Sequence, residues 1–257
     1  MDPDLDEESM SQKVHKRHRN QASDLQRAKL IRPEPRNRVQ LQYQNALENT
    51  PLTLAFGPAG TGKTYIAAAT AAYLYLTGQA DYIRMSRPKV EFEGHGYLPG
   101  KLEKKLEPLL LPVIEVLEEC LGVAVVRDLT ASGQITMEPF DYLRGRTLKN
   151  SFVILDEAQN VTEHQMRLFV TRIGENSKVL LNGDVTQSDI RKASGLSWCL
   201  YMVRKYGIDS SVVEFTSDHV ERSDICRQWV QAMEAEDSNS PDARPSDDTG
   251  LRRFLAA

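Results

Sequence analysis

Residues 57–64 read Gly-Pro-Ala-Gly-Thr-Gly-Lys-Thr and match the spacing G-x-x-x-x-G-K-[ST], which is called Walker A. The glycines allow the backbone to wrap closely around phosphate oxygens, with the N–H groups pointing inward. In such a loop Lys63 would reach the β- and γ-phosphates of a nucleotide, and the Thr64 hydroxyl would bind Mg²⁺. The stretch therefore predicts a site for a nucleoside triphosphate.

The flanks of this loop have the character of a strand and a helix. Residues 52–56 form an apolar run short enough for a buried strand, and residues 65–76 are rich in helix formers and end before Gly78. A helix that begins at the loop adds partial positive charge beside the phosphates. A chance glycine-rich loop would lack this context, so we expect a strand, a phosphate-binding loop and a helix in that order.

A second stretch carries two carboxylates at the end of an apolar run. Residues 152–155 read Phe-Val-Ile-Leu and lead into Asp156 and Glu157, the pattern called Walker B. Asp156 is expected to hold Mg²⁺ through water, and Glu157 to polarise the attacking water. The adjacent glutamate favours hydrolysis over phosphoryl transfer to another substrate, because it supplies the base that water needs. A buried strand that ends in a solvated acidic pair is the weaker alternative.

Polar residues at two further places extend the predicted nucleotide site. Residues 178–181 read as a strand whose polar continuation includes Gln187, the candidate sensor of the γ-phosphate, with Asp184 in support. A short helix is expected just upstream of the first strand, and there Gln40 or Gln42 would present its amide to the adenine edge. The spacing does not choose between these two glutamines.

Basic side chains near two predicted strands suggest contact with a nucleic acid. Residues 81–86 read as a strand, and ligands of open α/β sheets bind at the carboxyl ends of strands. Two arginines also flank Gly145 just before the Walker B strand, where phosphate contact and simple solvation are equally good interpretations. The candidate contacts are Ser86, Arg87, Lys89, Arg144 and Arg146.

The region between the second strand and the Walker B strand reads as an insertion. Residues 101–122 carry an apolar stripe at spacings of three and four, which predicts a helix that Pro108 and Pro112 kink or split. Residues 123–126 and 134–137 are candidates for a small hairpin around a Ser-Gly pair.

Composition bounds the class of protein. The chain has 257 residues, a net charge of −4 and 40% hydrophobic residues, which is typical of a globular protein. No apolar run has transmembrane length, and the acidic start is unlike a signal peptide. Three cysteines stand far apart, so no disulfide framework or zinc site is expected and a reducing cytoplasm is the predicted location.

The chain is expected to form one domain between two tails. Residues 1–30 pair an acidic run with a basic one and read as a solvated, disordered arm, the alternative being an arm that contacts nucleic-acid phosphates. The ATPase domain is expected over residues 31–233. Residues 234–257 are acidic and rich in Pro and Ser, which predicts a disordered tail.

Together these motifs resemble the PhoH-like family of P-loop ATPases, from about residue 40 to residue 229. Beyond Walker A, the resemblance rests on the stretches Ser86-Arg87-Pro88, Gly96-Tyr97-Leu98-Pro99-Gly100, Arg144-Gly145-Arg146-Thr147, Asp156-Glu157-Ala158-Gln159-Asn160, Gln165-Met166, Thr171-Arg172-Ile173-Gly174, Ser177-Lys178 and Gly183-Asp184-x-Thr186-Gln187. Walker A is general to a large superfamily, whereas the combination of the others is specific.

The resemblance implies an α/β fold with a RecA-like core similar to that of superfamily 1 helicases, in which a mostly parallel sheet is flanked by helices. It also implies that strand 178–182 lies between the strands of Walker A and Walker B. Gln40, which stands in a Gln-x-x-Tyr pattern with Tyr43, becomes the better candidate for adenine. Relatives with a ribonuclease domain exist, but this chain has no spare carboxylate cluster for one.

One position departs from the family pattern. The family usually has Val-Arg-His after the last strand, where this chain reads Val220-Glu221-Arg222-Ser223. Aligning Arg222 with the family's arginine requires one inserted residue. A two-domain helicase supplies such an arginine from its second core, so a single core predicts a homo-oligomer, with a hexameric ring as one form, in which Arg222 acts on the neighbour's site.

The function expected is ATP hydrolysis with Mg²⁺, coupled to single-stranded nucleic acid and to RNA rather than DNA. An ATP-switched oligomeric module acting on proteins is the alternative, and a small-molecule kinase is disfavoured by the Asp156-Glu157 pair. The expected catalytic residues are Lys63, Glu157, Gln187 and Arg222. The expected nucleotide contacts are Gln40, Gly57, Pro58, Ala59, Gly60, Thr61, Gly62, Lys63, Thr64 and Tyr65, and the expected metal ligands are Thr64 and Asp156.

Overall fold

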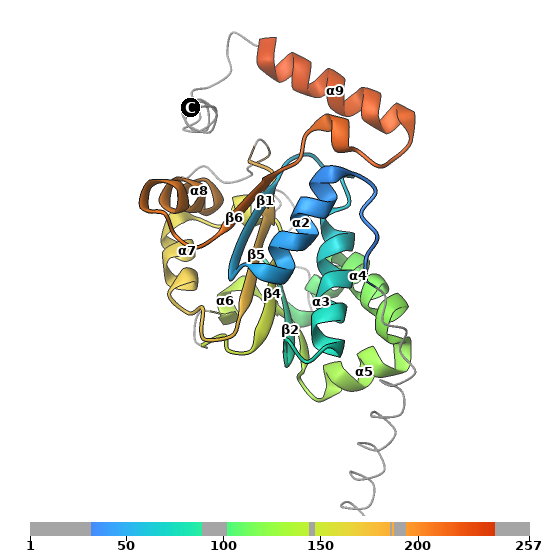
Figure 1. Ribbon diagram of the computed structural model, residues 1–257, viewed down its shortest axis with the longest axis vertical. Coiled ribbons are helices and arrows are strands. Elements are labelled where there is room, and N and C mark those ends of the chain that lie inside the picture. The colour runs from blue at the N-terminus through green and yellow to red at the C-terminus, as the bar shows by residue number, and fades with distance from the viewer. Residues whose placement is uncertain (1–31, 89–101, 144–146, 186, 188–193, 240–257) are drawn as a thin grey trace, which may run out of the picture.

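The structure, a computed structural model, describes residues 32–88, 102–143, 147–185, 187 and 194–239 (Figure 1). Six strands in these ranges form one parallel sheet in the order β3-β2-β4-β5-β1-β6. The strands are β1 Leu52–Phe56, β2 Tyr82–Arg87, β3 Ile135–Pro139, β4 Ser151–Leu155, β5 Lys178–Gly183 and β6 Ser211–Glu214. The sheet expected as mostly parallel is therefore parallel throughout the described residues.

Helices cover both faces of this sheet (Figure 1). They are α2 Arg38–Asn49, α3 Lys63–Leu76, α4 Leu102–Leu121, α5 Val123–Ala131, α6 Phe140–Leu143, α7 Glu163–Val170, α8 Gly195–Tyr206 and α9 Asp224–Asn239, with short 3₁₀ turns at Ala158–Asn160 and Ser217–His219. α2, α3, α4 and α5 pack on one face, and α6, α7 and α8 on the other. Successive strand residues alternate between the two layers, so Phe152 enters the first core and Val153 the second.

The strand order brings three carboxyl ends together at one edge of the sheet. β5 pairs with β4 on one side and with β1 on the other, with Leu181 opposite Leu155 and Gly183 opposite Phe56. The prediction that residues 178–182 lie between the Walker A and Walker B strands is confirmed. The loop after β1, the carboxylates after β4 and the polar end of β5 therefore face one another.

The expectation that Pro108 and Pro112 split the helix over residues 101–122 is wrong, while a kink at these prolines stays a prediction. α4 runs without interruption through Pro108 and Pro112. Each proline removes a hydrogen bond within the helix. The stripe that includes Leu110, Val113 and Leu117 is fully buried against the core, and this packing offsets that loss.

The expected hairpin is also wrong. Residues 123–131 form α5, and β3 pairs in parallel with β2, so that Ile83 lies opposite Ile135. The valines favoured a strand by propensity, but Val125, Val126 and Leu129 fall on one helical face and are buried. Burial of that face decided the structure.

The carboxyl-terminal part of the described chain is helical for longer than expected. α9 continues to Asn239, beyond residue 234, where a disordered tail was predicted to begin. No helix in the described ranges combines the length and the apolar character needed to cross a membrane.

Candidate functional site

The phosphate-binding loop lies between the end of β1 and the start of α3. Gly57 marks a close approach, because a Cβ built at this residue would lie only 2.0 Å from the carbonyl oxygen of Phe215. Its backbone φ of +130° is also one that residues with a side chain rarely adopt. The strand–loop–helix arrangement predicted from the sequence is therefore present, and glycine at position 57 is required by the neighbouring strand end.

Lys63 is held inside this loop. Its Nζ donates to the carbonyl oxygens of Gly57 at 2.9 Å and Pro58 at 2.8 Å, and to Oγ1 of Thr61 at 3.1 Å. Burial lowers the pKa of Lys63 to about 8, against the opposing effect of the carboxylates of Asp184, Asp156 and Glu157. A buried ammonium whose partners are neutral oxygens favours a phosphate group as a counter-charge.

Asp156 follows β4, and its side chain is 15% exposed. Asn182 Nδ2 donates to its Oδ1 at 2.7 Å. Burial raises the pKa of Asp156, and the neighbouring charge of Glu157 raises it further, while Arg87 and Asn182 lower it. Because two adjacent carboxylates and a low-dielectric setting disfavour negative charge, this position suits a cation.

The donor set fits Mg²⁺ in one further respect. Oδ1 of Asn182 is buried and has no hydrogen-bond partner among the described residues, although it lies on the side chain that contacts Asp156. A hydrated cation at Asp156 would bring water molecules that donate to such an oxygen. The Asp156–Asn182 pair, with the Thr64 hydroxyl at the start of α3, therefore forms a suitable oxygen-rich setting for the ion.

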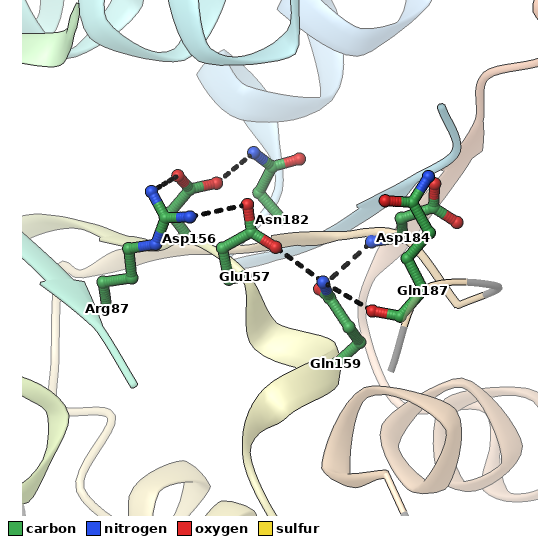
Figure 2. A network of polar contacts seen from close by, with 7 residues as sticks. All are labelled: Arg87, Asp156, Glu157, Gln159, Asn182, Asp184 and Gln187. Carbon is green, nitrogen blue, oxygen red and sulfur yellow. Dashed lines mark hydrogen bonds and ion pairs between the residues drawn. The ribbon is translucent and has the colours of Figure 1, made fainter. Parts of the chain in front are cut away.

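Glu157 lies between two donors, as Figure 2 shows. Its Oε1 pairs with Nη2 of Arg87 at 2.9 Å, and its Oε2 accepts from Nε2 of Gln159 at 2.6 Å. Its backbone has a φ of +52°, in the left-handed region that is uncommon for glutamate. The chain therefore turns sharply after Asp156, and the two donors define where the Glu157 carboxylate lies.

Gln159 connects this carboxylate to the end of β5. Its Oε1 accepts from the backbone N–H of Asp184 at 3.1 Å, and its Nε2 also donates to the carbonyl oxygen of Gln187 at 3.3 Å (Figure 2). Gln159 belongs to a stretch that resembles the family, but neither Gln159 nor Asn182 was predicted to have a role of its own. The sequence does show a polar residue at both positions, Gln159 just after the carboxylates and Asn182 on the sensor strand. Their contacts could not be predicted, because these depend on how the strands pair.

A cleft of about 890 Å³ lies beside these residues. It is lined by many of the predicted residues, namely Gln40, Gly57, Ala59, Gly60, Thr61, Gly62, Lys63, Thr64, Tyr65, Arg87, Asp156, Glu157, Asp184, Gln187 and Arg222. The structure thus brings the predicted phosphate, metal, base and sensor positions to one cavity.

The two candidate adenine residues are separated by the structure. Gln40 is buried at the cleft, where its Nε2 donates to the Thr61 carbonyl at 3.0 Å and its Oε1 accepts from the Arg36 N–H at 2.7 Å. Gln42 is exposed and lines a separate groove between α2 and β6. Only Gln40 is therefore placed to contact a nucleotide in the cleft.

Arg222 lies against the loop of its own chain. The Glu221 N–H donates to the Gly60 carbonyl at 3.0 Å, and a Cβ built on Gly60 would lie 3.0 Å from Cδ of Arg222. The arginine lines the cleft although its side chain is exposed. A single chain can thus bring Arg222 to its own site, whereas the sequence predicted action on a neighbour.

The predicted nucleic-acid contacts have different positions. The side chain of Ser86 is fully buried between neighbouring strands, so contact of that side chain with a nucleic acid is a wrong prediction. Arg87 is 24% exposed and faces the Walker B carboxylates rather than open solvent. Lys89, Arg144 and Arg146 lie outside the described residues.

Comparison with known proteins gives a consistent family match. Residues 31–234 match the family model described as "PhoH-like protein". Protein PhoH of Escherichia coli K12 is 41% identical over 204 residues, covering 77% of this chain and 57% of that protein. The PhoH-like protein of Bacillus subtilis is 40% identical over 199 residues, covering 76% and 62%. The PhoH-like protein of Mycobacterium leprae is 43% identical over 211 residues, covering 81% and 60%.

The aligned region thus spans about three fifths of the length of these relatives. Among solved structures, the large terminase ATPase domain of Thermus phage P74-26 has a TM-score of 0.45 and 16% identity, covering 83% of this chain and 92% of that chain. A likeness of this size does not bear on function.

Proposed function

The chain belongs to the PhoH-like family, and from that premise we propose that it binds ATP with Mg²⁺ and hydrolyses it. The observation that carries this proposal is the meeting of Lys63, Asp156 and Glu157 in one cleft. Hydrolysis of a nucleoside triphosphate calls for a cation beside the β- and γ-phosphates, a ligand for Mg²⁺ and a base for the attacking water. The three residues come from two chain segments, the loop after β1 and the turn after β4, which the parallel sheet brings together.

Each residue has a distinct role in the proposed reaction. Lys63 and the loop N–H groups bind the β- and γ-phosphates, and Thr64 and Asp156 would hold Mg²⁺. The ion would neutralise charge on the phosphate oxygens when bound. Glu157 accepts a proton from the attacking water, with Gln159 fixing the direction of its carboxylate.

The remaining predicted residues act at the two ends of the nucleotide. Gln187 senses the γ-phosphate from the end of the segment after β5, and Arg222 stabilises negative charge that develops on that group. Gln40 contacts the adenine edge. Its amide oxygen accepts one hydrogen bond and its amide nitrogen donates one, so each atom keeps the capacity for one more.

Coupling to single-stranded nucleic acid, and to RNA rather than DNA, is the finer part of the proposal. It is supported by Arg87 at the cleft and by the basic residues Lys89, Arg144 and Arg146 in the sequence. The test is the rate of phosphate release with and without oligouridylate or oligothymidylate, at about 50 mM and about 200 mM salt. Stimulation that weakens as salt rises supports the proposal, and rates unaffected by either polymer contradict it.

An ATP-switched module acting on proteins is a second candidate, because α9 has an exposed apolar stripe. Ile225, Trp229 and Met233 recur every four residues and are 60%, 64% and 54% exposed. Large apolar side chains in one row are typical of protein contacts. ATPase stimulation by a co-purifying protein and not by RNA would favour this candidate.

Whether Arg222 serves its own site or a neighbour's is tested by mixing subunits. In a homo-oligomer, Arg222→Ala and Glu157→Gln chains recover ATPase activity when mixed if the arginine acts on the neighbour. If it acts within its own chain, the mixture keeps only the sum of the two separate rates. Native mass measurements of the same samples establish whether an oligomer such as a ring forms.

A further inference from the structure

Arg87 forms an ion pair with the residue assigned as the base. Nη2 lies 2.9 Å from Oε1 of Glu157, and Nη1 lies 3.9 Å from Oδ2 of Asp156. The contact follows from strand register, because Ser86 lies opposite Leu155, so that Arg87, the last residue of β2, lies beside the chain that leaves β4 at Asp156. The proposed chemistry of Asp156 and Glu157 does not by itself call for this arginine.

Both oxygens of the Glu157 carboxylate are engaged in this arrangement. Arg87 donates to Oε1 and Gln159 donates to Oε2 at 2.6 Å (Figure 2). A carboxylate oxygen that already accepts a hydrogen bond from a guanidinium is less accessible to a water molecule, because the guanidinium occupies the place from which the water would approach. Glu157 therefore lies in a geometry that restrains its action as a base.

The arginine approaches from the side away from the phosphate-binding loop. In the sheet, β2 is separated from β1 by β4 and β5, so roughly 14 Å lies between the two strands at the usual spacing of about 4.8 Å. Figure 2 shows Arg87 on one side of Glu157, with Gln159, Asp184 and Gln187 on the other. An anion that binds Arg87 from that side would approach from the β2 end of the cleft, whereas the phosphate-binding loop lies at the β1 end.

The ion pair is suited to exchange. The side chains of Arg87 and Glu157 are 24% and 34% exposed, and partly exposed pairs of this kind are weak. A phosphodiester offers two oxygens to the planar guanidinium and competes directly with a carboxylate. Loss of the Arg87 contact would leave Oε1 of Glu157 open to water, while Gln159 still holds Oε2.

We propose that Arg87 is a positioning residue that restrains Glu157 until a phosphodiester of a bound nucleic acid strand takes over its guanidinium. The inference rests on the proposed ATPase function and deepens it. It identifies how the partner's backbone would accelerate hydrolysis, through a single contact at the end of β2. Phosphate oxygens, and not base edges, carry the effect, so the acceleration is expected with any single strand that binds.

The test compares ATP hydrolysis by wild type, Arg87→Gln, Arg87→Lys and Arg84→Gln, each with and without saturating oligouridylate. Arg84 is the matched control, because it lies two residues earlier on β2 and contacts Ser151 Oγ at 3.3 Å and the Tyr82 ring rather than the carboxylates. Glu157→Gln measures the background rate. Thermal melting and binding of a fluorescent ATP analogue establish that each variant is folded and loaded.

The expected result is a basal rate for Arg87→Gln about three- to tenfold above wild type, with little further stimulation by the polymer. Arg87→Lys keeps the charge but lacks the fork that spans two carboxylates, so its basal rate is expected between those of wild type and Arg87→Gln. Arg84→Gln should match wild type in both conditions. If Arg87→Gln fails to fold, the comparison of Arg87→Lys with wild type decides, and a basal rate above that of wild type is the expected result.

Three results would overturn the inference. If the basal rate of Arg87→Gln falls toward that of Glu157→Gln, Arg87 contributes to hydrolysis. If the rate is unchanged, Arg87 does not restrain Glu157. If the rate rises but oligouridylate still stimulates it fully, the phosphodiester does not act through Arg87. The proposed function fails separately, if wild type and every Arg87 variant hydrolyse ATP no faster than Glu157→Gln. If wild type hydrolyses ATP and Arg87→Gln has the same basal rate, the inference about Arg87 is wrong but the proposed function stands.

Discussion

Nε2 of Gln159 lies 2.6 Å from Oε2 of Glu157, and this contact fixes the carboxylate of the proposed base relative to the sensor strand. The same amide reaches the backbone of Asp184 through its oxygen, at 3.1 Å. One buried side chain thus spans from the strand that carries the base to the strand that ends near the γ-phosphate position. Displacement of either strand end would be transmitted to Glu157 through Gln159.

Gln159→Ala is expected to lower kcat about tenfold while changing KM little, because the base loses its orientation but the nucleotide contacts remain. The partly buried N–H of Asp184 loses its side-chain partner, which should cost about 0.5–1.5 kcal/mol of unfolding free energy. Steady-state phosphate release and urea denaturation measure the two effects. Gln134→Ala, whose amide contacts Tyr75 far from the cleft, is the control. Full kcat in Gln159→Ala would contradict the role of Gln159.

Gly183→Ala should produce the same loss of kcat although neither Gln159 nor Glu157 is substituted. A Cβ built at Gly183 would lie 2.3 Å from Oε1 of Gln159, so the amide must move and Glu157 with it. ATP affinity should stay within about threefold of wild type, while kcat falls as in Gln159→Ala.

Gly78→Ala serves as the control for adding a methyl group to a glycine. Its φ is +69°, so the change costs about 1–2 kcal/mol of strain. The added Cβ meets nothing within 4 Å, and kcat should be unchanged. Equal kcat losses in the two glycine variants would mean that general destabilisation, and not the contact with Gln159, explains the effect.

ATP binding is expected to weaken as pH rises through about 8. Burial lowers the pKa of Lys63 to about 8, so the side chain is charged below that pH and loses its proton above it. The triphosphate stabilises the ammonium, so binding above pH 8 must also take up a proton, and affinity should fall by up to about tenfold per pH unit.

Dissociation constants of a fluorescent ATP analogue at about pH 7 and about pH 9 measure this effect. Lys63→Met removes the titrating group and should bind weakly at both values, which makes it the control. An equal affinity of wild type at both pH values would show that Lys63 does not lose its proton in that range.

Gln40→Ala is expected to weaken ATP binding more than GTP binding, because the adenine edge presents a donor and an acceptor that match a primary amide. Competition of ATP and GTP against a labelled nucleotide measures the ratio of the two affinities. Gln42→Ala, which alters an exposed residue outside the cleft, should leave that ratio unchanged. If Gln40→Ala weakens both nucleotides equally, Gln40 only braces the loop through Thr61.

The parts of the fold that follow from local pattern could be predicted from the sequence. The Walker A spacing fixed the loop between β1 and α3, and the apolar runs before Asp156 and Asn182 are the buried strands β4 and β5. α5 could not be predicted in this way. Val125 and Val126 favour a strand by propensity, and only burial of their helical face against the core decides otherwise.

The parts of the site that depend on strand register could not be predicted. Arg87 was assigned to nucleic-acid contact from its place at a strand end, but pairing of β2 with β4 puts its guanidinium against Glu157. Gln159 likewise reaches Glu157 because the backbone adopts a left-handed φ at residue 157. Glycine is the residue that usually indicates such a conformation in a sequence, and position 157 is a glutamate.

The rate of phosphate release by Glu157→Gln compared with wild type tests the central claim most directly. The substitution keeps the size and the hydrogen-bonding reach of the side chain but removes the base. Wild type should release phosphate from Mg²⁺–ATP, and Glu157→Gln should bind ATP with similar affinity and turn over about 10²- to 10⁴-fold more slowly. A variant that hydrolyses ATP at the wild-type rate would contradict the assignment of Glu157 as the base.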